Sequence, residues 1–136
     1  MTTDQILLLD GTHDENSKKT IQKVLRKIGP LSRYSDEEFV PIEALEKMVT
    51  VITKKYAIQP QWIACTYDSD ISGVYGNYSC GVKTSDTHAW LGTVMTCSIY
   101  ELMAKLVIFM YAQVKSGNII LRTEIKRKEA RKGEDE

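Results

Sequence analysis

Aromatic side chains gather in the middle of the sequence, where they are the residues best suited to hold a ligand. Trp62, Tyr78 and Trp90 fall in three predicted strands, and His88 comes two residues before Trp90. Flat rings beside small residues form a slot in which a nucleobase can stack. Arg122 adds a cation for polar or phosphate contacts. The alternative is that these rings fill the core and pack across strands, because aromatic residues are common in sheets.

Other patterns that carry chemistry are incomplete. Cys65 or Cys80 near His88 suggests a thiol nucleophile, but no third group to orient the histidine is evident. The turn Asp68-Ser69-Asp70-Ile71-Ser72-Gly73 matches the first half of a calcium loop, with Ser79 where the loop requires a carboxylate. The 3 cysteines and 2 histidines include no closely spaced pair of ligands. We therefore expect no enzyme activity, no metal ion and no cofactor.

Charge and hydropathy narrow the classes of partner. The 18 basic residues balance the 18 acidic ones, so the 136-residue chain has no overall field that gathers nucleic acid or anionic membrane. No basic, apolar leader stands at the start, and no apolar run approaches the roughly 18 residues of a membrane span. An odd number of cysteines favours reduced thiols. We expect a soluble cytoplasmic protein with no membrane contact.

Hydrophobic periodicity predicts an α+β fold in one domain, residues 1–121. Two N-terminal helices come first, with apolar stripes spaced three and four residues apart and a stop at Gly29-Pro30. Pro60 ends the second helical region, and three strands in an antiparallel meander follow. The predicted strands cover residues 62–67, 75–83 and 88–95. Strict alternation places His88, Trp90, Gly92 and Val94 on one face of the third strand.

A long apolar C-terminal helix completes the predicted α-β-β-β-α order. Ser98 and Glu101 have the spacing of a capping box, and Gly117 ends the helix. Apolar residues surround most of the segment from Ile99 to Val114, so a single sheet face cannot cover it. We therefore expect a homo-oligomer that joins through Ile99–Val114, most simply a two-fold dimer.

The last fifteen residues, 122–136, form a highly charged tail. We expect a frayed helix or a disordered segment there. Its basic residues can bind phosphates, which keeps nucleic-acid binding open as an alternative function. Its own glutamates lower the net charge of the tail, so a solvated segment is the other reading.

The order of elements from residue 41 to 117 resembles a double-stranded-RNA-binding domain. That resemblance implies phosphate contacts from the start of the last helix, where Ser98 to Lys105 include one lysine, and from the loop at Asp68-Ser69-Asp70. The stretch Ala89 to Val94 followed by Ser98-Ile99-Tyr100-Glu101 is also similar to the antitoxin half of small bacterial toxin–antitoxin pairs.

A third resemblance is to small accessory proteins of phages and prophages. It rests on Trp90-Leu91-Gly92-Thr93-Val94 followed by Tyr100-Glu101-Leu102 with Ala104-Lys105, over about residues 60–117. Some such proteins counter host defence, including oligomeric sponges that sequester cyclic nucleotides such as cyclic ADP-ribose derivatives. The resemblance implies a non-enzymatic, homo-oligomeric binding protein in the host cytoplasm. Its partner would be a nucleotide-like small molecule or a host protein.

Overall fold

The computed structural model describes residues 1–68, 75–96 and 98–135, without the side chains of 62–68, 75–77, 128–129 and 131–135. The described elements combine helices with a three-stranded antiparallel sheet, which confirms the predicted mixture of helix and sheet. In chain order they are α1 (Thr3–Leu7), α2 (Glu15–Leu25), the 3₁₀ helix η1 (Gly29–Arg33), α3 (Ile42–Lys55), β1 (Ile58–Asp68), β2 (Tyr75–Thr84), β3 (Trp90–Thr96), α4 (Ile99–Lys115) and α5 (Arg122–Asp135).

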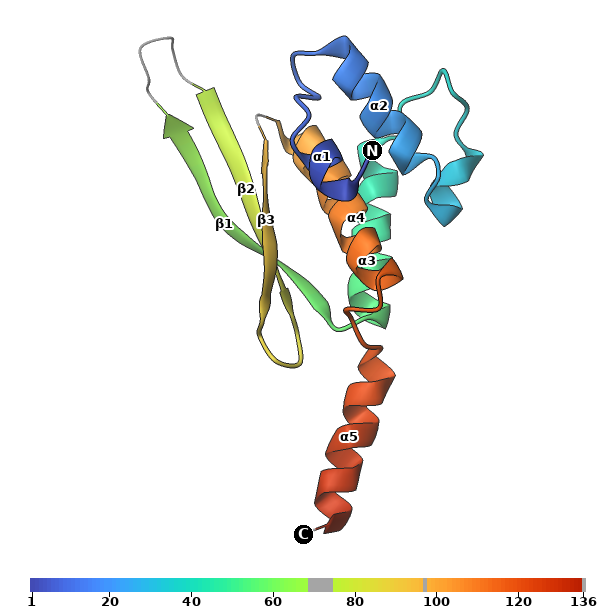
Figure 1. Ribbon diagram of the computed structural model, residues 1–136, viewed down its shortest axis with the longest axis vertical. Coiled ribbons are helices and arrows are strands. Elements are labelled where there is room, and N and C mark those ends of the chain that lie inside the picture. The colour runs from blue at the N-terminus through green and yellow to red at the C-terminus, as the bar shows by residue number, and fades with distance from the viewer. Residues whose placement is uncertain (69–74, 97, 136) are drawn as a thin grey trace.

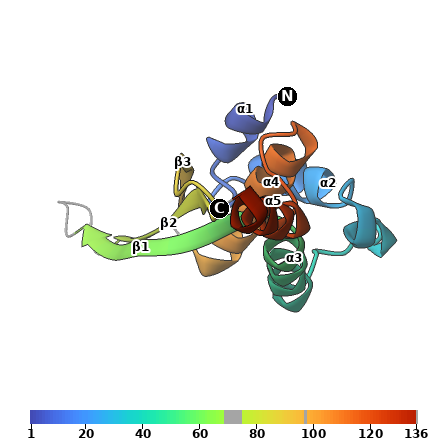
Figure 2. The same ribbon diagram turned by 90° about the horizontal axis from the view of Figure 1, so that it is seen from below.

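The sheet has the strand order β1-β2-β3 and the helices gather on one side of it (Figures 1 and 2). Helix α4 packs against α3, β2 and β3, and α3 also contacts β1. Pro60 lies inside β1, so the prediction that it ends the helical region was wrong. Because β1 is an edge strand, a residue without an N–H is tolerated there.

Both outer strands contain a break in register. In β3, Val82 pairs with Gly92 but Lys83 pairs with Trp90, so Leu91 is an extra residue. Val82 is buried against the helices, whereas Lys83 belongs to the opposite face. Trp90 therefore lies on the outer face and Gly92 on the helix-facing side. The prediction that strict alternation keeps the two on one face was wrong because a bulge intervenes.

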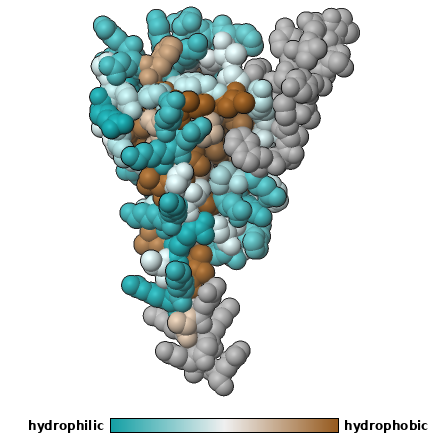
Figure 3. Space-filling view, turned by 180° about the vertical axis from the view of Figure 1, so that it is seen from behind, coloured by the Kyte–Doolittle hydropathy of each residue, from teal (hydrophilic) through white to brown (hydrophobic). Residues whose placement is uncertain are grey.

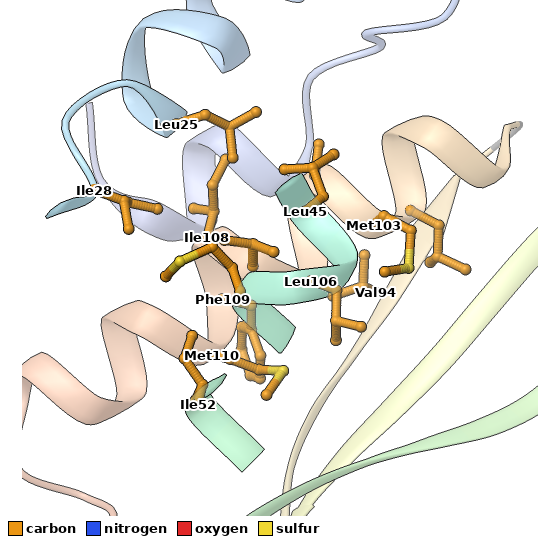
Figure 4. Close-up of a cluster of buried hydrophobic side chains, with 14 of the residues drawn as sticks. Leu25, Ile28, Leu45, Ile52, Val94, Met103, Leu106, Ile108, Phe109 and Met110 are labelled. Atoms are coloured by element: carbon orange, nitrogen blue, oxygen red, sulfur yellow. The ribbon is translucent and has the colours of Figure 1, made fainter. Parts of the chain in front are cut away.

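The chain itself encloses most of α4. Its residues from Glu101 to Met110 are all buried in a single subunit. Figure 4 shows side chains of α4 meeting Leu25 at the end of α2, Ile28 just after that helix, Leu45 and Ile52 of α3, and Val94 of β3. From behind, hydrophilic side chains cover most of the described surface, with smaller apolar patches between them (Figure 3). The homo-oligomer stays a prediction. The apolar residues of α4 that motivated it are already buried within one subunit from Glu101 to Met110.

Two charged residues lie within that buried segment. The Nζ atom of Lys105 is 2.6 Å from Oε1 of Glu101, and the two side chains are 3% and 5% exposed. Residues 9–12 cover the pair: the Gly11 N–H donates to Glu101 at 3.0 Å, the Thr12 hydroxyl donates to Glu101, and Lys105 donates to the Leu9 carbonyl. The N-terminal residues are thus docked on α4, and they include helix α1.

Helix α5 extends away from the body of the molecule (Figure 1). It starts where residues 120–121 run beside residues 56–57, just before β1, with the Ala57 N–H donating to the Ile120 carbonyl at 2.9 Å. Arg122 anchors that start, since its Nε donates to the Thr53 carbonyl at 2.5 Å. The charged tail thus begins at a fixed point at the base of α3.

Candidate functional site

The predicted ligand-binding residues do not converge on one site. Tyr78 is half-buried and packs against the core, whereas Trp90 is 59% exposed on the outer face of the sheet. Arg122 is held by Thr53 and also donates to the Ser85 hydroxyl at 3.2 Å, so it joins elements of the fold. The side chain of Trp62 lies outside the described part of the structure.

His88 belongs to the turn between β2 and β3. It is exposed and has a φ of 56°, in the left-handed region that few residues other than glycine adopt. Two hydrogen bonds brace this turn, because the Thr84 N–H donates to the Ala89 carbonyl at 2.9 Å and the Ala89 N–H donates to the Thr84 hydroxyl at 3.0 Å. His88 therefore lies just before β3, the strand that carries Trp90, and outside the pairing of β3 with β2.

The register of the strands instead assembles a row of polar and aromatic residues on the outer face. Gln59 of β1 pairs with Lys83 of β2, which pairs with Trp90 of β3. Gln59 and Trp90 are exposed and Lys83 is half-buried. An amide, an ammonium group and an indole thus follow one another across the three strands.

The next row on the same face adds further polar groups. Gln61 pairs with Gly81, which pairs with Thr93. Gln61 and Thr93 are exposed, and Gly81 between them has no side chain. Two amides that both donate and accept hydrogen bonds therefore lie on the same face as the indole of Trp90.

These two rows suit a flat ring that carries an anionic group. The indole offers a stacking surface, the glutamine amides match the hydrogen-bonding edge of a base, and an ammonium group attracts a phosphate. Lys83 forms no ion pair with any carboxylate that the structure describes, which leaves its charge available. Of the residues in these two rows, the sequence-based prediction included Trp90 and did not include Gln59, Gln61, Lys83 and Thr93. The alternation of Gln59 and Gln61 about Pro60 was the one available signal.

Catalysis by a thiol gains no support from Cys80. Its side chain is fully buried, its S–H donates weakly to the Gly81 carbonyl, and burial raises the pKa of the thiol. A raised pKa lowers the fraction of reactive thiolate. His88 is exposed in its turn, and the side chain of Cys65 lies outside the described residues.

The described residues form neither a cluster of metal ligands nor a helix that could span a membrane. No three His, Cys, Asp or Glu side chains come together there as ligands for a metal ion. The turn that resembles a calcium loop falls on residues 69–74, outside the described residues. Within the described helices, none has the length and apolar character required to cross a membrane.

The start of α4 does not present the phosphate contacts that the double-stranded-RNA-binding resemblance implies. Lys105 is only 3% exposed and is already paired with Glu101. Residues 9–12 cover this part of the helix, so a phosphate has no direct access to the ammonium group.

Another groove lies between the end of α2 and the last turns of α4. It has a volume of about 480 Å³ and is lined by apolar side chains together with Lys27, Tyr111 and Lys115. Lys115 lies in the last turn of α4, where the helix dipole favours a cation whether or not a ligand binds. Because this lysine needs no ligand to explain it, we place the candidate site on the outer sheet face.

Comparisons with protein-family models, with curated proteins and with solved structures found no match to this chain.

Proposed function

We propose that this chain is a non-enzymatic binding protein that captures a nucleotide-like small molecule on the outer face of its sheet. The observation that carries the proposal is the row Gln59–Lys83–Trp90, with the indole 59% exposed. In this arrangement the base stacks on Trp90, the glutamine amides contact its edge, and Lys83 pairs with the phosphate.

The biological setting is part of the same proposal. The resemblance of residues 90–105 to phage accessory proteins supports a role in the host cytoplasm, where the protein would lower the free concentration of a nucleotide signal used in defence. Sequestration requires binding without turnover. The ligand must therefore be recovered chemically intact after it is released from the protein.

Calorimetric titration with a panel of mononucleotides and cyclic nucleotides, including cyclic ADP-ribose derivatives, tests the proposal. Base–aromatic stacking is worth about 1–3 kcal/mol, so Trp90→Ala should weaken binding roughly 5- to 150-fold. Trp90→Phe keeps a ring and should retain most of the affinity. Met95→Ala, on the same face and 62% exposed, is the matched control and should bind like the wild type.

Three results would count against this function. Absence of binding to every nucleotide in the panel is the first, and equal affinity of wild type and Trp90→Ala is the second. Chromatographic detection of a converted nucleotide would contradict the non-enzymatic part. Affinity that rises with oligonucleotide length and falls steeply with salt would favour the nucleic-acid alternative instead.

A further inference from the structure

The two edges of the sheet differ in how they are protected against pairing with another strand. The β1 edge contains Pro60, and residues 120–121 pair with residues 56–57, immediately before the first residue of β1. Proline and a covering segment are both devices that keep an edge from accepting a further strand. Among the residues that the structure describes, the β3 edge has neither of them. This contrast singles out β3 as the edge that remains available.

The available part of β3 is the regular stretch Gly92–Thr96. These five residues pair with β2 without a break, from Val82↔Gly92 to Tyr78↔Thr96. They include no charged residue and no proline. Beyond the ladder with β2, none of their backbone groups hydrogen-bonds to another residue that the structure describes. Thr93 and Met95 are exposed on the outer face of this stretch.

We propose that the β3 edge pairs antiparallel with the β3 edge of a second copy, which joins two sheets into one of six strands. The strand favours a second copy of this chain as its partner. Both edges are then uncharged, so pairing about a two-fold axis buries no unpaired charge. The backbone groups of Gly92–Thr96 then obtain partners. The helices of both subunits lie on the same side of the joined sheet.

The alternation of side chains limits the register. Outer-face residues must pair with outer-face residues of the second copy. The two-fold axis therefore lies between the two copies of one and the same residue. An axis at Val94 uses the whole regular stretch and places Thr93 opposite Met95 of the partner subunit. The outer faces of both copies then form one continuous surface. This pairing replaces Ile99–Val114 as the interface of the expected oligomer.

Sedimentation equilibrium of the full chain without ligand tests the inference independently of nucleotide binding. The wild type should sediment as a dimer. Thr93→Lys should raise the dimer dissociation constant about tenfold. The two-fold axis places the new lysine in the interface twice, and a charged side chain on an edge strand opposes pairing. Gln61→Lys, on the same face but at the guarded β1 edge, should leave the dimer intact. Equal melting temperatures of the two variants would show that both remain folded.

A mixing experiment identifies the register. Chains with Thr93→Lys and chains with Met95→Glu should associate with each other more tightly than either associates with itself, because lysine then faces glutamate across the new strand pair. A wild type that is monomeric at all concentrations would overturn the inference. So would a dimer that Thr93→Lys leaves unchanged.

Discussion

The buried pair of Glu101 and Lys105 makes the sharpest prediction about stability. Lys105→Met keeps the length of the side chain and removes its charge. The Glu101 carboxylate then stays buried with only the Gly11 N–H and the Thr12 hydroxyl as donors. Removing one partner of a buried ion pair costs about 3–5 kcal/mol, because the remaining charge is left without its counter-ion.

Urea denaturation measures that cost. For a slope of about 2 kcal/mol per molar, the midpoint of unfolding should fall by roughly 1.5–2.5 M. Lys47→Met, at an exposed position of α3, is the matched control and should change stability by no more than about 0.5 kcal/mol. The double variant Glu101→Gln with Lys105→Met should be more stable than Lys105→Met alone, since it buries no charge.

Two results would refute this reasoning. A loss of less than about 1 kcal/mol in Lys105→Met would show that the ammonium group is not buried against Glu101 in solution. A double variant less stable than either single variant would show that the charges themselves, and not the cost of leaving one unpaired, stabilise the fold. Protection of the Gly11 amide from hydrogen exchange reports directly on whether the N-terminal residues stay docked.

Three further predictions concern other positions. Gly92→Ala should cost about 1–3 kcal/mol in urea denaturation, because the new Cβ would lie 3.0 Å from the Phe109 ring, and Phe109→Leu in the same chain should recover part of that loss. Gly117→Ala should lower the melting temperature more than Gly117→Asn, because φ is +78° there and asparagine tolerates the left-handed region better than alanine. Burial raises the pKa of Cys80 and of Tyr100, so the unfolded chain releases these protons at lower pH than the folded chain. These groups should therefore leave the free energy of unfolding unchanged below about pH 8 and lower it as pH rises through about 9 to 11. The loss should be smaller in Cys80→Ala. An alkaline profile of Cys80→Ala identical to that of the wild type would contradict this.

The elements that local patterns determine were predictable from the sequence. The Asp14 side chain accepts the hydrogen bond that caps α2, and Ser98 does the same for α4. Ile21 and Leu25 point into the core as their spacing predicts. In each case the signal and the structure it determines lie within about one turn of helix, so no knowledge of distant contacts is required.

The face of Trp90 could not be predicted because a distant contact decides it. Gly92 lies against the ring of Phe109, and an added Cβ would come within 3.0 Å of that ring. The extra residue Leu91 then turns Trp90 to the other side of the sheet. Strict alternation is the correct expectation for a regular strand, but no local pattern in residues 88–95 predicts the bulge.

The burial of Glu101 and Lys105 depends on contacts across some ninety residues of sequence. Their spacing of four residues is visible in the sequence and usually marks an exposed pair on a helix. An apolar surface on α4 can accept residues 9–12 in more than one position, because hydrophobic contact has no direction. Hydrogen bonds from Gly11 to Glu101 and from Lys105 to the Leu9 carbonyl fix one position. We infer that the pair is retained for this specificity, so the neutral double variant should stay folded while Gly11 exchanges faster.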